Sequence, residues 1–157
     1  MPEPLINRKL IELDLLADTK EKAIAELAEM LYAEGKLSDL SGFIEHIHER
    51  EQLMSTYCGY DTAMPHAESP FVKEPAFAFG RTRGFLWDEK DTPVNFIFLL
   101  AIPETSEKNP DESKHIQLMS SIAFLVLEDK VREIWLNTSL KKDITDTFLL
   151  FEQLNKI

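Results

Sequence analysis

In the first third of the chain, apolar residues recur at helical spacing between Asp18 and Gly35. Asp18 opens this stretch, and Glu21, three residues later, forms a capping pair with it. The apolar positions that follow share one helical face: Ile24, Leu27, Ala28 and Leu31. Gly35 comes directly after this periodic stretch and is typical of a helix end. The pattern therefore predicts an amphipathic helix between Asp18 and Gly35.

Further helices are predicted on the same grounds. A second helix starts near Ser38 or Asp39 and runs toward Arg50. Its apolar face consists of Leu40, Phe43, Ile44 and Ile47. Toward the end of the chain, the periodicity predicts helices over residues 115–129, 131–136 and 140–154.

Segments rich in strand-forming residues lie between these groups of helices. Residues 76–81 and 85–87 are predicted strands, and a short strand is predicted to end at His66. Residues 94–102 are almost entirely apolar, which is typical of a strand buried on both faces. Helices are therefore expected on both sides of the sheet, and their interleaving with the strands predicts one α/β domain over residues 1–157.

Charge narrows the classes of partner. The formal net charge of −11 and the pI near 4.8 argue against nucleic acid, whose phosphates require a basic face. An acidic surface instead steers a basic protein toward the molecule. We expect no secretory signal and no membrane span, because no apolar run approaches about 18 residues. The single cysteine, Cys58, cannot form an internal disulfide and fits a reducing cytoplasm.

Histidines are the first candidates for chemistry. His46 and His48 form H-x-H within a predicted helix, where residues two apart point in different directions and chelate a metal poorly. Both are predicted to be solvated helix residues. His66 follows a proline, which limits the freedom of the backbone that presents the imidazole. His115 lies near a predicted helix start, where a phosphate and a neutral imidazole are both favoured.

Two interpretations of His66 stay open from the residues alone. It can be a functional nitrogen, because a neutral imidazole attacks phosphorus well and ligand sites gather at strand ends in α/β sheets. It can equally be an ordinary residue at the end of a strand. Arg50 also has two interpretations. Its guanidinium can hold a phosphoryl group, or it can be a surface residue paired with Glu49 or Asp61.

Other chemistries have less support in the sequence. A metal site could use His66, His115 and Cys58 or an acid, but no stretch has ligand spacing such as C-x-x-C or H-E-x-x-H. There is also no G-x-S-x-G elbow and no phosphate-binding P-loop. Cys58 is predicted to be a small packing residue. We therefore expect no metal ion in the site.

Three segments, taken together and in order, resemble a known family. They are "RE…STYCGYDTAMPHA", "VNFIFLLAIPE" and "HIQLMSSIAFLVLED". They are similar to the active-site segment, the central strand and the histidine-led helix of the enzyme IIA proteins of the bacterial sugar phosphotransferase system, fructose–mannitol class. The resemblance covers nearly the whole chain. It implies a single domain with a mixed sheet of about five strands and helices on both faces.

The resemblance also implies a phosphotransferase function. Proteins of this class take a phosphoryl group from the histidine-containing phosphocarrier protein and pass it to a IIB component. The IIB component phosphorylates the sugar while the membrane IIC component transports it. No cofactor is required, because the donor phosphohistidine is already energetic. Relatives of the same fold act instead as regulatory, phosphorylation-dependent binding modules, and the sequence leaves that alternative open.

Carried over by position, the resemblance assigns the site residues. His66 is the phosphorylated nucleophile, His115 stabilises the phosphoryl group, and Arg50 compensates its charge. Ser55 and Thr56 lie in the binding loop beside the site. We expect His66, His115 and Arg50 to meet at a shallow depression open to solvent, with the Nε2 atom of His66 within reach of a partner protein.

The loop departs from the family pattern at three positions where glycine is common. These positions hold Tyr57, Asp61 and Ala67. Glycine permits backbone shapes and close approaches that other residues resist. Asp61 is predicted to add a negative charge near the incoming phosphate, so the choice of partner and sugar stays open.

Overall fold

The computed structural model describes residues 7–88, 92–104 and 112–154, with the backbone alone at 112–117 and 151–154. The helices are η1 (Arg8–Leu10), α1 (Lys20–Ala33), α2 (Leu40–Leu53), α3 (Glu112–Val126), α4 (Asp129–Asn137) and α5 (Lys141–Leu154). The strands are β1 (Ile11–Glu12), β2 (Tyr57–Gly59), β3 (Thr62–Ala63), β4 (His66–Ser69), β5 (Ala76–Leu86) and β6 (Pro93–Pro103). Every predicted helix is present within a few residues of its expected bounds.

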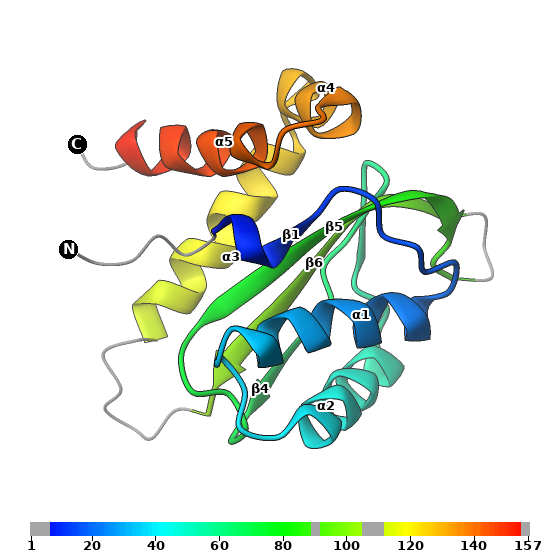
Figure 1. Cartoon of the computed structure of the whole chain (residues 1–157), viewed down its shortest axis with the longest axis vertical. Helices are drawn as coiled ribbons and strands as arrows, with labels where there is room; N and C mark the ends of the chain where they lie inside the picture. The colour runs from blue at the N-terminus through cyan, green and yellow to red at the C-terminus, as the bar shows by residue number, and fades with distance from the viewer. Residues whose placement is uncertain (1–6, 89–91, 105–111, 155–157) are drawn as a thin grey trace.

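The described strands form one mixed sheet of six. The order is β1-β5-β6-β3-β2, and β4 also pairs with β6. Strands β5 and β6 are antiparallel, whereas β3 and β4 both run parallel to β6 and pair with successive parts of it. The helices cover both faces, α1 and α2 on one and α3 to α5 on the other (Figure 1). The predicted α/β fold with a mixed sheet of about five strands is confirmed.

The strand near His66 differs from the prediction. It begins at His66 instead of ending there, because β3 stops at Ala63 and pairing with β6 resumes at His66. Pro65 has no N–H to donate to a ladder, so the interruption falls at Met64 and Pro65. The carbonyl of Pro65 still accepts a hydrogen bond from the Leu100 N–H at 2.9 Å.

Two smaller predictions are also corrected. The strands expected at 76–81 and 85–87 are one strand, β5, whose pairing with β6 shifts register between Arg81 and Phe85. Polar residues hide this continuity in the sequence. The first helix is capped by Thr19, not Asp18, since the Thr19 hydroxyl accepts from the Lys22 N–H at 3.2 Å.

Strand β5 shows how the two faces of the sheet differ. The face toward α1 and α2 carries the small residues Ala76, Ala78 and Gly80. A Cβ atom at Gly80 would lie about 3 Å from the side chains of Leu15 and Leu27. The alternate residues carry large rings on the opposite face. Small residues therefore let α1 approach the strand closely, whereas the other face requires bulky side chains to fill the space beneath three helices.

An aromatic cluster fills that second face. Its members are Phe77, Phe79, Phe96, Phe98, Trp135 and Phe148. Trp135 is fully buried and stacks on Phe148 with the ring centroids 6.0 Å apart, and its indole N–H donates to the Thr147 hydroxyl at 3.1 Å. The cluster anchors α4 and α5 to the sheet, since aromatic side chains bury the most apolar area per residue.

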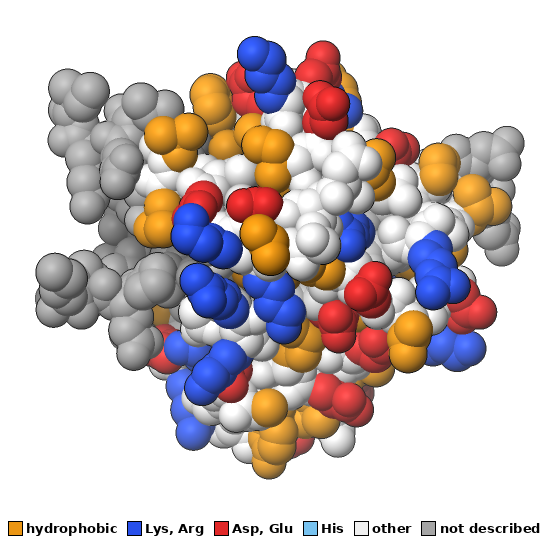
Figure 2. Space-filling model, turned by 45° about the horizontal axis from the view of Figure 1, so that its top comes forward, with side chains coloured by type: hydrophobic (Ala, Val, Ile, Leu, Met, Phe, Trp, Pro, Cys, Tyr) orange, Lys and Arg blue, Asp and Glu red, His pale blue; other side chains and the backbone are white. Residues whose placement is uncertain are grey.

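Exposed apolar side chains are spread over the face of the molecule seen in Figure 2. Figure 2 shows them scattered among charged side chains of both signs over the end of the molecule formed by α4 and α5. Scattered exposed apolar residues are normal for a globular surface. In the part of the chain that is described, no helix has the length and hydropathy that a membrane crossing requires.

Candidate functional site

An open depression of about 630 Å³ lies where α2 packs against β4. Its lining residues come from α2, β4 and the end of β6: His46, Glu49, Arg50, Leu53, His66, Ala67, Glu68 and Ile102. Among the described strands, β4 pairs with β6 alone, so the depression lies at an edge of the sheet. The structure thus brings Arg50 and His66 to one depression, as expected.

The imidazole of His66 is held in one orientation by the backbone. Its Nδ1 atom lies 2.9 Å from the carbonyl oxygen of Met64. A carbonyl can only accept a hydrogen bond, so Nδ1 carries the proton and Nε2 of the neutral ring has a free lone pair. The ring is half-buried. Pro65 therefore has a clear local role, because it brings the Met64 carbonyl next to the ring that follows it.

Arg50 approaches the depression from the last turn of α2. One guanidinium N–H donates to the carbonyl oxygen of Met54 at 3.1 Å, which satisfies one of the free carbonyls at the helix end. The partner of Arg50 is thus a backbone carbonyl, and not Glu49 or Asp61 as in the alternative interpretation. A guanidinium has five N–H donors, and this bond uses one.

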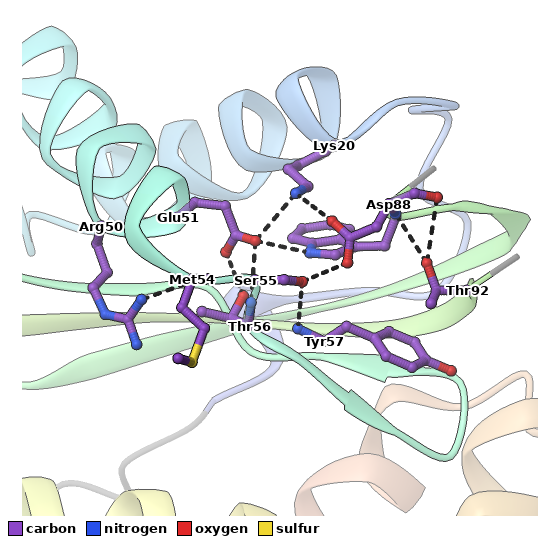
Figure 3. Close-up of polar contacts among 10 residues, drawn as sticks. Lys20, Arg50, Glu51, Met54, Ser55, Thr56, Tyr57, Asp88 and Thr92 are labelled. Atoms are coloured by element: carbon purple, nitrogen blue, oxygen red, sulfur yellow. Dashed lines mark hydrogen bonds and ion pairs between the residues drawn. The ribbon is translucent and has the colours of Figure 1, made fainter. Parts of the chain in front are cut away.

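The next residue, Glu51, points away from the depression into a buried polar network (Figure 3). Its carboxylate is 5% exposed and accepts four hydrogen bonds. The donors are Lys20 Nζ at 3.1 Å, Trp87 Nε1 at 3.1 Å, Thr56 N at 3.1 Å and the Thr56 hydroxyl at 2.5 Å. A buried carboxylate requires such compensation. Glu51 therefore connects the loop after α2 to both α1 and the end of β5.

Lys20 completes this network from α1. Its ammonium also pairs with Asp88 at 3.0 Å and lies 5.0 Å from the centroid of the Trp87 ring. Burial lowers the pKa of Lys20, but hydrogen bonds and the negative charges of Asp88 and Glu51 outweigh it and raise the pKa above its ordinary value. Lys20 therefore stays charged over the physiological range.

Ser55 and Thr56 belong to this network and not to the lining of the depression. The Ser55 hydroxyl donates to Asp88 at 2.5 Å, and the Thr56 hydroxyl to Glu51 (Figure 3). The carbonyl oxygen of Thr56 accepts from the Met64 N–H at 3.0 Å. Both residues thus order the loop beside His66, whereas their predicted role in binding stays a prediction.

His115 lies in the first turn of α3, near the helix start as expected. Its side chain is outside the described residues, so the prediction that it shares a depression with His66 stays a prediction. The strand pairing shows on which face of the sheet His66 lies. His66 pairs with Leu100, whose side chain packs in the layer under α3 to α5. The side chain of His66 therefore leaves the sheet on the face that α3 covers.

His46 is a lining residue that the sequence analysis missed. It was predicted to be a solvated helix residue, yet it is half-buried and its Nδ1 lies 2.8 Å from the Ser69 hydroxyl. Its ring stacks on Phe71 with centroids 5.5 Å apart. The signal that could have found it is its spacing, four residues before Arg50 and thus on the same helix face. His48 is also half-buried but does not line the depression.

The departures from the family loop have separate structural roles. Tyr60 and Asp61 have φ of 55° and 57° and form the two-residue turn between β2 and β3, a conformation that glycine adopts without strain. The Asp61 carbonyl accepts from the Asn95 N–H at 2.8 Å. Asp61 does not line the depression, and the prediction that it adds a negative charge near the incoming phosphate stays a prediction. Ala67 does line it, with its side chain buried.

Cys58 is exposed, so its predicted packing role is wrong. Its thiol donates to the Thr62 carbonyl across the hairpin at 3.3 Å. Within the described ranges, no three His, Cys, Asp or Glu side chains group in a way that could hold a metal ion.

Sequence comparison finds relatives over most of the chain. One is the PTS system fructose-specific EIIABC component of Bacillus subtilis (strain 168), 30% identical over 144 residues. The match covers 90% of this chain but 22% of that protein, so the chain spans about a fifth of its length. Another is the PTS system fructose-specific EIIA component of Haloferax volcanii, 28% identical, with 88% of each chain covered.

Solved structures share the fold. The nitrogen regulatory protein IIA-Ntr of Neisseria meningitidis superposes with a TM-score of 0.80 at 27% identity, covering 92% of this chain and 96% of the other. The IIA mannitol enzyme of Escherichia coli, solved in complex with phosphorylated enzyme IIB mannitol, gives a TM-score of 0.76 at 21% identity, with 92% and 96% covered. Residues 4–150 match the family described as phosphoenolpyruvate-dependent sugar phosphotransferase system, EIIA 2, and the chain belongs to that family.

Proposed function

We propose that this protein is a phosphohistidine carrier. It accepts a phosphoryl group on Nε2 of His66 from the histidine-containing phosphocarrier protein and passes it to a IIB component for sugar uptake. The observation that supports this most is the hydrogen bond from His66 Nδ1 to the Met64 carbonyl at 2.9 Å. That bond leaves Nε2 as the nucleophilic atom, and the ring lies in a depression open to a partner.

The transfer step requires positioning and charge compensation. The Nε2 lone pair of His66 attacks the phosphorus of the donor's phosphohistidine in line. The new N–P bond forms as the old one breaks, and the departing electron pair returns to the donor imidazole. The proton on Nδ1 stays in its bond to Met64, where the carbonyl dipole stabilises the positive charge that develops on the ring. Arg50 turns unused N–H donors toward the phosphoryl oxygens.

His115 would add a donor from the first turn of α3. A helix N-terminus has free N–H groups and positive partial charge, both of which favour a phosphoryl group. Register places the side chain of His66 on the face that α3 covers, which supports this role. Ser55 and Thr56 would act indirectly, because their bonds order the loop whose Thr56 carbonyl holds Met64.

The proposed partners are proteins that bring a surface histidine into an open depression. A net charge of −11 raises the rate of encounter with a basic phosphocarrier. One relative is named as an EIIABC component, a name that combines A, B and C components of EII. A solved structure of the same fold is a complex with phosphorylated IIB. The protein would work in the cytoplasm, at the membrane IIC component. No metal or other cofactor takes part in the proposed step.

The proposed function predicts an acid-labile phosphate on His66. The protein is incubated with phosphoenolpyruvate, enzyme I and the phosphocarrier, and the phosphate is mapped by mass spectrometry. His66→Ala should accept no label. Label that persists in His66→Ala would refute the assignment, and addition of a purified IIB component tests onward transfer.

A second candidate is a regulatory module that uses the same phosphohistidine as a signal. The observation that favours it is the superposition on a nitrogen regulatory protein, IIA-Ntr, with a TM-score of 0.80. The two functions differ in the last step. Phosphoryl transfer to a IIB component at catalytic rates supports transport, whereas binding of a partner that changes with phosphorylation, without onward transfer, supports regulation.

A further inference from the structure

Three residues on one face of α2 are spaced four apart. They are Gly42, His46 and Arg50, and the last two line the depression together with His66. Residues four apart on a helix are surface neighbours, with Cβ atoms about 5–6 Å apart. His46 and Arg50 are therefore neighbours on the face of α2 that lines the depression.

The ring of His46 is held in a defined plane. Phe71 stacks on it with an interplanar angle of 11°. This stacking depends on Gly42, because a Cβ atom there would lie 2.3 Å from Cε2 of Phe71. The missing side chain thus makes room for Phe71 one turn before His46.

The hydrogen bonds around Ser69 are compatible with a proton on Nε2 of His46. The Ser69 hydroxyl oxygen accepts from the Phe71 N–H at 3.2 Å and lies 2.8 Å from Nδ1 of His46, and we assign its own hydrogen to that nitrogen. With Nδ1 as the acceptor, Nε2 of the neutral ring carries the proton, and the NMR measurement below tests this assignment. His46 and His66 thus have opposite tautomers: one presents an N–H at Nε2, the other a lone pair.

We propose that His46 is a phosphoryl-binding residue that donates its Nε2–H to an oxygen of the phosphoryl group as it moves between the partner's histidine and His66. This rests on the proposed function. His46 and Arg50 form a pair of donors on α2, and they line the same depression as His66 because β4 is an edge strand and the depression extends around that edge. Glu49 also lines the depression, and its carboxylate suits a basic partner surface.

The test separates the hydrogen-bond donor from the ring. His46→Phe keeps a ring to stack on Phe71 but has no donor, whereas His46→Gln keeps an N–H donor without the ring. His46→Ala has neither, and His48→Ala on the same helix is the matched control, because His48 does not line the depression. The measurement is kcat/KM for phosphorylation of His66 by the phosphorylated phosphocarrier. A hydrogen bond to a charged group changes a rate by about tenfold or more.

The expected result is a loss of about tenfold in the Ala and Phe variants, recovery in the Gln variant and no change in the control. Binding of the unphosphorylated phosphocarrier, measured by calorimetry, should be unchanged in all four. A parallel loss of that binding would make His46 a docking residue and overturn the proposal. So would wild-type kinetics in His46→Phe, or an NMR spectrum that shows the proton of His46 on Nδ1. Absence of label on wild-type His66 would instead refute the proposed function itself.

Discussion

Glu51 offers the most direct test of how the site is held in place, because its buried carboxylate connects three parts of the chain. The change is Glu51→Ala, which removes the acceptor of four hydrogen bonds. The Trp87 N–H and the Thr56 N–H would then be buried without a partner, while Lys20 would keep Asp88. The loop after α2 would keep only its indirect connection to α1, through Ser55 and Asp88.

The expected loss of unfolding free energy follows from the buried donors that Glu51→Ala leaves without an acceptor. A buried donor without a partner costs about 1–3 kcal/mol, and removal of one member of a buried ion pair costs about 3–5 kcal/mol in all. We expect the free energy of unfolding to fall by about 3–5 kcal/mol, which lowers Tm by roughly 10 °C for a chain of this length. Glu51→Gln keeps the volume and one acceptor oxygen, so its loss should be smaller, at about 1–3 kcal/mol.

The assay is urea unfolding followed by tryptophan fluorescence, with Trp87 as a probe inside the network. Glu45→Ala on the exposed face of the same helix is the control and should stay within about 0.5 kcal/mol of the wild type. Transfer of phosphate to His66 should also slow in Glu51→Ala, because Thr56 no longer holds Met64. A Glu51→Ala protein as stable as the control would refute the reasoning.

Two further predictions concern charge and the second histidine. The pKa of Lys20 is raised in the folded state, so its contribution to stability is complete below the ordinary value of 10.5 and is lost as pH rises through the raised pKa. The difference in unfolding free energy between the wild type and Lys20→Met should therefore shrink above pH 10.5; a difference that stays constant would contradict this. His115→Ala should still accept phosphate on His66 but pass it on about tenfold to a hundredfold more slowly, as measured by quench-flow with a IIB component. Unchanged transfer in both directions would leave His115 without a role at the site.

The fold could be predicted where local pattern and tertiary structure agree. The apolar faces of α1 and α2 and the run in β6 are long, so their type follows from periodicity alone. The start of β4 could not be predicted, because a four-residue strand is defined by its partner, and His66 pairs with Leu100, which lies 34 residues further on. The cap at Thr19 was missed because Asp18 is an equally good acceptor one residue earlier.

The candidate site also has one part that could be predicted from local sequence and one part that could not. Pro65 directly before His66 is visible in the sequence, and so is the family resemblance that pairs His66 with Arg50. The roles of Glu51 and His46 depend on Lys20, Trp87 and Ser69, which are distant in sequence and carry no motif. A buried carboxylate or an ordered imidazole becomes visible only when its partners are known.

The pairing of β3 and β4 along one edge of β6 makes chain length at Met64 and Pro65 a critical quantity. Both strands are in register with β6, so the two residues between them work as a spacer of set length. Removal or insertion of one residue there would turn His66 to the opposite face of the sheet, away from α3. The turn at Tyr60 and Asp61 is less constrained, because it is exposed at the tip of a hairpin and only the Asp61 carbonyl of its two residues bonds to β6. Insertions and deletions among homologues should therefore gather at the hairpin tip and avoid the proline, even where the residues themselves vary.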